Sequence, residues 1–187
     1  MKHQCNQFSQ EYEHFSFEIL LSSSYDDDIL EGSINFFDIL YPDTKGTKKY
    51  IANIIFYIFN AYNLDEILLL ADGISSDLEY VASAYGAYSN EAGGMGAVAI
   101  IDEFYLTEEA KNFYEKVQIN KCFLIETIEK LQIIGTGTLI FMSKALILNL
   151  SKSERILLIN ELLDINFIPI YQDANDVVLA RNLDYIV

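Results

Sequence analysis

The sequence predicts a single α/β domain in which a mixed central sheet is flanked by helices. Of the 187 residues, 51% are apolar and 13% are aromatic, which is enough to form a sizeable core. In the second half, apolar runs typical of strands alternate with runs of helical period. The chain has only two prolines and no Gly/Ser-rich tract, so we expect no linker. We therefore expect residues 1–187 to form one domain, with residues 1–14 as a mobile N-terminal segment.

The first half begins with an expected hairpin. Residues 15–23 (FSFEILLSS) are rich in β-branched and aromatic residues, and residues 29–41 (ILEGSINFFDILY) form a second such run. Residues 48–63 (KKYIANIIFYIFNAYN) predict a helix, because apolar residues recur there at spacings of three and four. Residues 64–74 fit a short helix or a buried strand. Residues 75–88 predict a second helix, capped by serine.

The second half alternates strands with helices. Residues 97–106 (AVAIIDEFYL) are apolar at nearly every position, which predicts a central strand buried on both faces. Residues 108–131 predict one long helix, and residues 135–148 (GTGTLIFMSKALIL) the next strand. Residues 151–165 predict a capped helix, and residues 167–187 a closing pair of strands. The apolar residues expected on the packing face of the long helix are Val117, Phe123, Leu124, Ile128 and Leu131.

The charge balance argues against direct binding of nucleic acid. The chain has 28 acidic and 12 basic residues, a formal charge of −16, and no cluster of Lys and Arg to neutralise phosphates. Such acidity fits either a self-repelling surface or a face that docks a basic partner. The first 15 residues lack the apolar segment of a signal peptide, and the longest apolar run is too short to span a bilayer. We expect no membrane association and a cytoplasmic location.

Several strings from residue 97 to the end resemble the GNAT acetyltransferase superfamily. The strings are AVAIIDEFYL, IGTGTLIFMSKAL and INELLDINFIPIYQDANDVVLARNLDY, and the likeness extends upstream to residues 68–88. In that family a central strand leads into a long helix, a strand, a short helix ending at a Tyr and an "lGF" string, and a final hairpin. The resemblance implies a GNAT-like fold, acetyl-CoA as cofactor and acetyl transfer to an amine.

The family's cofactor motif is absent at the expected place. That motif, Arg/Gln-x-x-Gly-x-Gly/Ala, lets pyrophosphate approach backbone N–H groups at a helix start. This sequence has no glycine between Gly96 and Gly135. One alignment puts Gln118 and Asn120 in the glycine places and Glu115 in the basic place, where a carboxylate would repel pyrophosphate. The lysines that could offset it do not converge at helical spacings of five: Lys111, Lys116 and Lys121.

Two further positions bear on catalysis. The family's general-acid Tyr aligns with Leu162, which cannot donate a proton, and the glycine of "lGF" aligns with Asn166, which also adopts the left-handed conformation. Asp102 and Glu103 lie on the central strand, where GNAT-like enzymes often carry a carboxylate that accepts the proton of the amine. Because neighbouring strand residues point to opposite faces, at most one of the two is expected to serve.

These observations lead to two functional expectations. The first is a GNAT-like protein without acetyl-CoA chemistry or any cofactor, which binds a basic protein partner through an acidic, tyrosine-rich surface, as an inhibitor, immunity protein or antitoxin of bacteria or phages would. Tyr80, Tyr85 and Tyr88 are candidates for that surface, with core packing as the alternative.

The second expectation is an active N-acetyltransferase acting on a cationic amine. Glu103 would then be the base. The cofactor residues would be Phe113, Val117, Gln118 and Asn120. A different small ligand in the same cleft is a third possibility, and no metal site is expected. A cleft filled by Phe113, Tyr114 or Phe123 would exclude both kinds of ligand.

Overall fold

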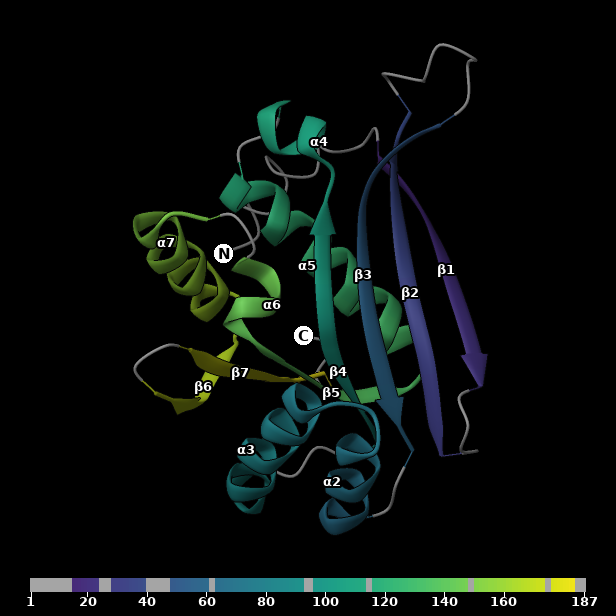
Figure 1. Cartoon of the computed structure of the whole chain (residues 1–187), viewed down its shortest axis with the longest axis vertical. Helices are drawn as coiled ribbons and strands as arrows, with labels where there is room; N and C mark the ends of the chain where they lie inside the picture. The colour runs from purple at the N-terminus through teal and green to yellow at the C-terminus, as the bar shows by residue number, and fades with distance from the viewer. Residues whose placement is uncertain are drawn as a thin grey trace.

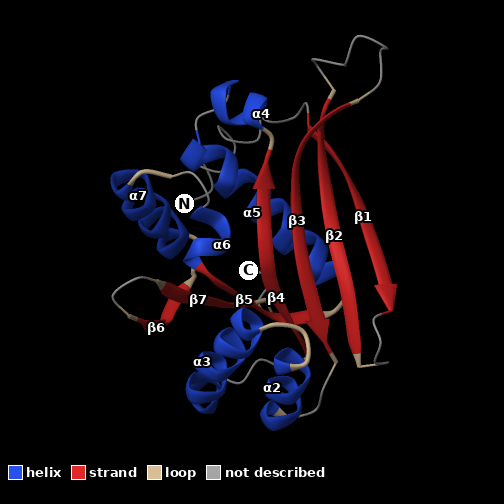
Figure 2. Cartoon of the chain, in the orientation of Figure 1, coloured by secondary structure: helices blue, strands red, loops and turns tan. Residues whose placement is uncertain are grey.

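A computed structural model describes residues 15–23, 28–39, 48–60, 63–92, 96–113, 116–147, 150–173 and 176–183. One mixed sheet of seven strands, in the order β1-β2-β3-β4-β5-β7-β6, is flanked by helices (Figures 1 and 2), which confirms the α/β class. The strands are β1 (Phe15–Ser23), β2 (Ile29–Asp38), β3 (Lys49–Phe59), β4 (Ala97–Leu106), β5 (Thr136–Met142), β6 (Ile168–Gln172) and β7 (Val177–Asn182). The helices are α2 (Leu64–Asp72), α3 (Ser76–Ala92), α4 (Glu108–Phe113), α5 (Lys116–Ile133), α6 (Ser143–Ile147) and α7 (Lys152–Asp164).

The pairing of the strands places β4 at the centre of the sheet. From β1 to β4 each strand is antiparallel to its neighbour. Strands β4 and β5 are parallel, and the β5–β7 and β7–β6 pairs are again antiparallel. The predicted β1–β2 hairpin is confirmed, with Phe15 opposite Asp38 and Ser23 opposite Leu30. The central strand and the closing β6–β7 pair are also confirmed, but β4 is buried on both faces only from Val98 to Ile101, and Glu103 and Tyr105 further along it are exposed.

The helix predicted over residues 48–63 was wrong, because this segment forms β3. Its side chains alternate: Ile54 and Phe56 are buried toward α5, whereas Asn53, Ile55 and Tyr57 are half-buried on the other face. A strand that buries apolar groups on both faces also produces spacings of three and four, and the β-branched and aromatic composition favours a strand. Residues 64–74, for which the sequence allowed either a short helix or a buried strand, contain α2.

The long helix is described in two parts, α4 and α5, and residues 114–115 lie outside the described part of the chain. All five residues expected on its packing face are buried. The strand predicted over residues 135–148 ends at Met142, where α6 begins. At this point the Asp176 carboxylate accepts hydrogen bonds from the Ser143 hydroxyl and from the Lys144 backbone N–H, the latter at 3.1 Å, and so stabilises the start of α6. Asp176 is 33 residues from Ser143 in the sequence, so no local pattern indicates this interaction.

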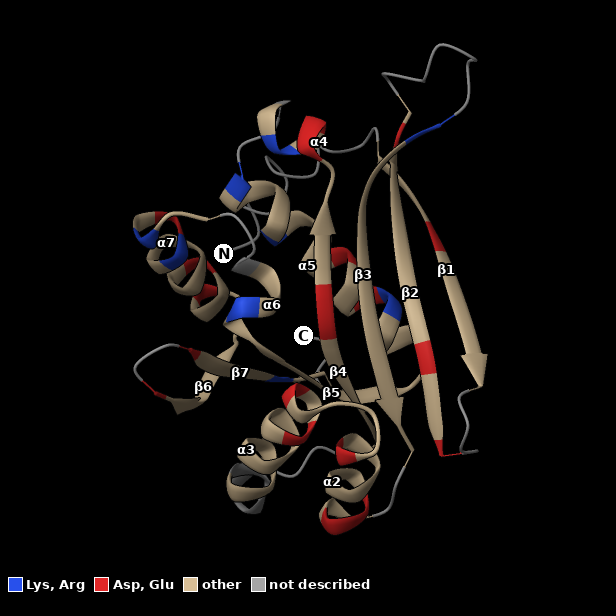
Figure 3. Cartoon of the chain, viewed as in Figure 1, with Lys and Arg blue, Asp and Glu red and all other residues tan. Residues whose placement is uncertain are grey.

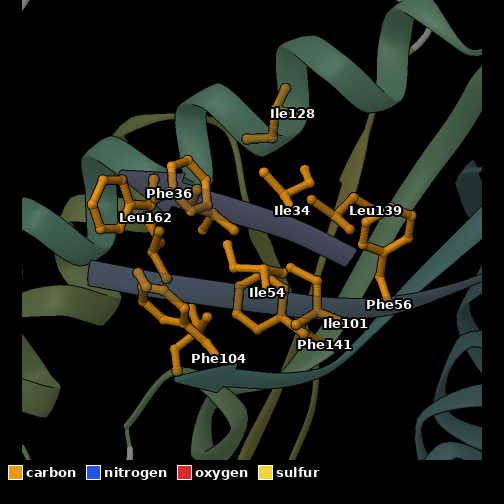
Figure 4. Close-up of a cluster of buried hydrophobic side chains, with 14 of the residues drawn as sticks. Ile34, Phe36, Ile54, Phe56, Ile101, Phe104, Ile128, Leu139, Phe141 and Leu162 are labelled. Carbon is orange, nitrogen blue, oxygen red and sulfur yellow. The ribbon is translucent and has the colours of Figure 1, made fainter. Parts of the chain in front are cut away.

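The main core lies between the sheet and α5. Figure 4 shows side chains from several strands, among them Ile54, Phe104 and Phe141, meeting Ile128 of α5 and Leu162 of α7. A second cluster of buried residues lies between the opposite face of the sheet and the α2–α3 pair, and it does not extend over β1. Helices therefore cover the α5 side of strands β1 to β4 more fully than the other side.

The end of α7 has the backbone geometry that the sequence predicts. Asn166 has a φ of 66°, and the N–H groups of Asn166 and Phe167 donate to the carbonyls of Leu163 and Leu162, both at 3.1 Å, which is a Schellman motif. We expect Asn166→Gly to raise the free energy of unfolding by about 0.5–1 kcal/mol and Asn166→Ala to lower it by about 1 kcal/mol. Urea titration of both variants checks this, and equal effects of the two would contradict it.

Candidate functional site

The two central strands diverge at the middle of the sheet. Parallel pairing between β4 and β5 runs from Ala97 opposite Thr136 to Ile101 opposite Phe141. Beyond that point β4 continues to Leu106, while β5 ends and leads into α6. Helix α6 packs against β4 beyond the last paired residues, and its Ala145 and Leu146 are buried (Figure 1). Side chains of α6 therefore occupy the space beside β4 where β5 no longer pairs with it.

A β-bulge in β4 lies at the same point. Ile55 of β3 is opposite Glu103 and Phe56 is opposite Ile101, so Asp102 is an extra residue in β4. Ile101 and Phe104 both belong to the α5-side cluster, with two residues between them where regular alternation allows one. Asp102 and Glu103 therefore both lie on the opposite side, and the expectation that they face opposite sides was wrong.

Asp102 lines a small cavity together with Asp77 and Lys144. The cavity has a volume of about 30 Å³, enough for a water molecule, and Met142 and Ala145 contribute its apolar wall. The Lys144 ammonium lies 2.8 Å from Asp77 Oδ1 at its rim. Figure 3 shows the acidic band of β4 facing α6 and the start of α3. Partial burial, and then the Glu103 and Asp77 carboxylates, raise the pKa of Asp102 above its ordinary value.

This raised pKa makes the stability dependent on pH. The folded protein holds the Asp102 proton more tightly than the unfolded chain, so the contribution to stability is full below the ordinary pKa of 3.8 and is lost as pH rises through the folded pKa. We expect Asp102→Asn to raise the unfolding midpoint at neutral pH, with a smaller gain at the acidic end of the range. Thermal unfolding at several pH values checks this. An equal gain at every pH, or the same gain in the control Glu129→Gln, would contradict it.

The start of α5 does not supply the expected cofactor residues together. The Val117 side chain is fully buried in the α5-side core, so it cannot line a ligand site. Asn120 is also buried: its Nδ2 donates to the Lys116 carbonyl at 2.7 Å, and its Oδ1 has no hydrogen-bond partner among the described atoms. Gln118 is half-buried. The side chain of Phe113 lies outside the described part.

The expected base is on the other side of the sheet from these residues. Glu103 is exposed on the face of β4 that points away from α5, whereas Val117 and Phe123 pack against the α5 face. Phe123 fills the core and stacks on Phe36 at 4.2 Å between ring centroids. In the described structure α6 packs at the divergence of β4 and β5, and the residues whose presence in the cleft would exclude a ligand were Phe113, Tyr114 and Phe123. Of these three, the Phe113 side chain and Tyr114 are not described.

The lysines near the start of the long helix do not form an anion site. As predicted, they do not converge, because each forms an ion pair with a different glutamate. The pairs are Lys111 with Glu108, Lys116 with Glu154, and Lys121 with Glu161. The last two join α5 to α7. Leu162, which the resemblance aligns with a general-acid Tyr, is buried in the core.

The sheet presents an acidic face with tyrosines that sequence reasoning did not locate. We call it the open face: the side of β1–β4 that points away from α5, without the end of it that α2 and α3 cover at Phe59 and Val98. No described helix lies in front of β1, β2 or β3 in the view of Figure 1. Its carboxylates are Glu18, Glu31, Asp102 and Glu103, and its tyrosines are Tyr50, Tyr57 and Tyr105. Asn53 Nδ2 donates to Asn35 Oδ1 at 2.9 Å near its middle.

The tyrosines and carboxylates of the open face are close enough to influence one another. Partial burial, and then Glu31 and Asp102, raise the pKa of Tyr57. Partial burial, and then Tyr105 and Glu103, raise the pKa of Tyr50. The open face is thus one electrostatic environment, rich in hydroxyls and negative charge.

The tyrosines predicted from spacing on α3 do not form an exposed patch. Tyr85 is buried in the core, as the alternative interpretation held. Tyr80 is half-buried, and its hydroxyl donates to Asp173 Oδ2 at 2.9 Å. The side chain of Tyr88 lies outside the described part. The aromatic surface belongs to the sheet instead, where Tyr50 and Tyr105 are exposed.

Other site chemistry is limited in the described part of the chain. Within it, no group of three or more His, Cys, Asp or Glu side chains is placed to hold a metal ion. Burial, and then Glu126, raise the pKa of Cys122 to about 12, as for an unreactive thiol. None of the described helices combines the length and apolar character needed to cross a bilayer. A scan against models of protein families and a search of curated proteins both found no match.

Proposed function

We propose that this chain is a GNAT-like protein that binds another protein through its open face and has lost acetyl-CoA chemistry. The partner has a basic surface, and the role is that of an inhibitor, immunity protein or antitoxin in the cytoplasm of a bacterium. The observation that carries the proposal is the open face itself, where carboxylates and tyrosines share the part of β1 to β3 that α2 and α3 leave uncovered, together with the bulge of β4.

The chemistry of the open face suits a protein partner. Glu31 and Glu103 are exposed, and a negative field steers a basic partner toward them. Tyr50 and Tyr105 are 39% and 44% exposed, and tyrosine is enriched at interfaces because it combines apolar area with a hydroxyl. The hydrogen-bonded ladder of four antiparallel strands beneath them offers a rigid platform, which lowers the entropic cost of binding.

The loss of acetyl-CoA chemistry is supported by three features. Helix α6 packs beside β4 where the two central strands part. The lysines that could attract a pyrophosphate each face a glutamate. Leu162, in place of a proton donor, is packed in the core. Acetyl transfer requires room for the cofactor, positive charge near its pyrophosphate and a proton donor, and each feature removes one of these three.

The test compares two variants of equal charge. Glu31→Lys with Glu103→Lys alters the open face, and Glu129→Lys with Asp164→Lys makes the same change at exposed positions of α5 and α7. A partner captured by the wild-type chain is identified, and its affinity for all three proteins is measured at increasing salt. We expect the open-face variant to bind at least about tenfold more weakly, which corresponds to about 1.4 kcal/mol. Equal loss in both variants would overturn the proposal.

A second candidate function is acetyl transfer to a cationic amine. It is favoured by the bulge, which places two carboxylates, one with a raised pKa, at the strand divergence, where a proton acceptor would be useful. Calorimetric titration with acetyl-CoA, with a thermal-shift control, separates the two functions. We expect neither heat nor stabilisation. Micromolar binding with matching stabilisation would overturn the first proposal, and acetylation of spermidine by wild type and Glu103→Gln would then be compared.

A further inference from the structure

The two outer strands of the sheet are protected very differently. At one edge, β6 has five residues and includes Pro169, which has no N–H to offer a neighbouring strand. At the other edge, β1 has nine residues, no proline and a single charged side chain, Glu18. Proteins usually protect an exposed edge with short strands, proline or several charges, because free backbone groups invite pairing with another chain.

The side chains of β1 add apolar surface to this edge. Leu20 and Leu21 are 59% and 44% exposed. Phe17 and Ile19 are half-buried at the margin of the α5-side core. In Figure 1, β1 is the outermost strand, and none of the described elements packs beyond it. The edge therefore combines the outward backbone groups of a long strand with apolar side chains.

We propose that β1 pairs antiparallel with β1 of a second copy of this chain, about a two-fold axis at Ile19. The strand is self-complementary in this register, and all nine residues are paired. Phe17 lies opposite the partner's Leu21, and Ile19 lies opposite the partner's Ile19, which extends the α5-side core across the axis. Glu18 lies opposite the partner's Leu20. The two sheets become one continuous sheet with a doubled open face.

The charges of β1 permit this register. No two carboxylates are directly opposite, and Glu18 is 3.8 Å from the Lys48 ammonium of its own chain. A two-fold axis at Glu18 would place two carboxylates face to face, which is destabilising. The net charge of −16 opposes association of two copies, but salt screens it while leaving the apolar contacts in place. Self-association therefore strengthens with salt, whereas binding of a basic partner weakens.

The first test measures the mass in solution at low and high salt. We expect sedimentation to show a rise from 21.3 kDa toward twice that mass as protein and salt increase. Leu21→Lys should weaken the dimer at least tenfold, because its charge meets the partner's Phe17. Leu69→Lys is the matched control on α2, where the leucine is 71% exposed, and it should not change the dimer. A monomer under all conditions, or equal effects of the two variants, would overturn the proposal.

The second test fixes the register and does not depend on activity or on any other partner. In a chain carrying Cys5→Ser and Cys122→Ala, Ile19→Cys places two thiols directly opposite each other across the axis. Mild oxidation should crosslink most of the dimer, with Leu20→Cys crosslinking several-fold less because its thiols lie diagonally. Preferential crosslinking through Leu20→Cys, or none through either position, would overturn the register.

Discussion

Replacing Gly32 by alanine is expected to lower the free energy of unfolding by about 2–3 kcal/mol. Gly32 lies in β2 opposite Phe56 of β3, and a Cβ atom added to it would be 2.3 Å from Cε2 and Cζ of that ring. The ring has no space to move away, because Phe56 is fully buried. The effect is purely steric, since Gly32 does not have a left-handed backbone. Urea unfolding followed by circular dichroism measures it.

Two comparisons separate this contact from other effects of removing glycine. A Cβ atom added to Gly86 of α3 would have no neighbouring atom within 4 Å, so Gly86→Ala should raise the free energy of unfolding by about 0.5–1 kcal/mol. Adding Phe56→Leu to Gly32→Ala should cost less than the sum of the two single changes, because the shorter side chain relieves the clash. A loss no greater than that of Gly86→Ala, or strict additivity, would show that the contact does not matter.

The β2–β3 contact belongs to the half of the chain where the sequence was least informative. In β3, both faces carry Ile, Phe and Tyr, so the periods of helix and strand overlap and only the pairing with β2 and β4 decides between them. In α7, by contrast, the signal is local. The Ser151 side chain accepts from the Glu154 N–H, and the Glu154 carboxylate accepts from the Ser151 N–H, so the helix start can be recognised from these two residue types.

The candidate site depended still more on contacts that are remote in sequence. The bulge at Asp102 is a shift in the register between β3 and β4. It depends on the pairing of the two strands, whereas residues 97–106 alone predict a regular strand. The start of α6 is stabilised by Asp176, which is 33 residues from Ser143 and accepts hydrogen bonds from the first turn of the helix. The composition did predict an acidic surface with tyrosines. Its position on the open face follows from the placement of α2 and α3, which cover only one end of β2 and β3, and no local pattern encodes that placement.

The largest single loss of stability is expected for Phe123→Ala, at about 3–5 kcal/mol. This side chain is 1% exposed and is the point where α5 meets the sheet. Its ring centroid is 4.2 Å from that of Phe36, 5.2 Å from Phe15 and 6.2 Å from Phe104. Truncation removes all three ring contacts and leaves a cavity that neighbours on three strands cannot close. Thermal and urea unfolding measure the loss.

The same variant, Phe123→Ala, tests whether the stability of the α5-side core and binding at the open face are independent. Phe123 lies on the α5 side, whereas Glu31 and Glu103 lie on the other, so Phe123→Ala should lower stability while the folded fraction keeps its affinity for a basic partner. Ile133→Ala, at a 77% exposed position of the same helix, should change stability by no more than about 0.5 kcal/mol. If Phe123→Ala instead weakened binding at conditions where it remains folded, the binding surface would have to include α5. The proposal for the open face would then fail even though the fold is correct.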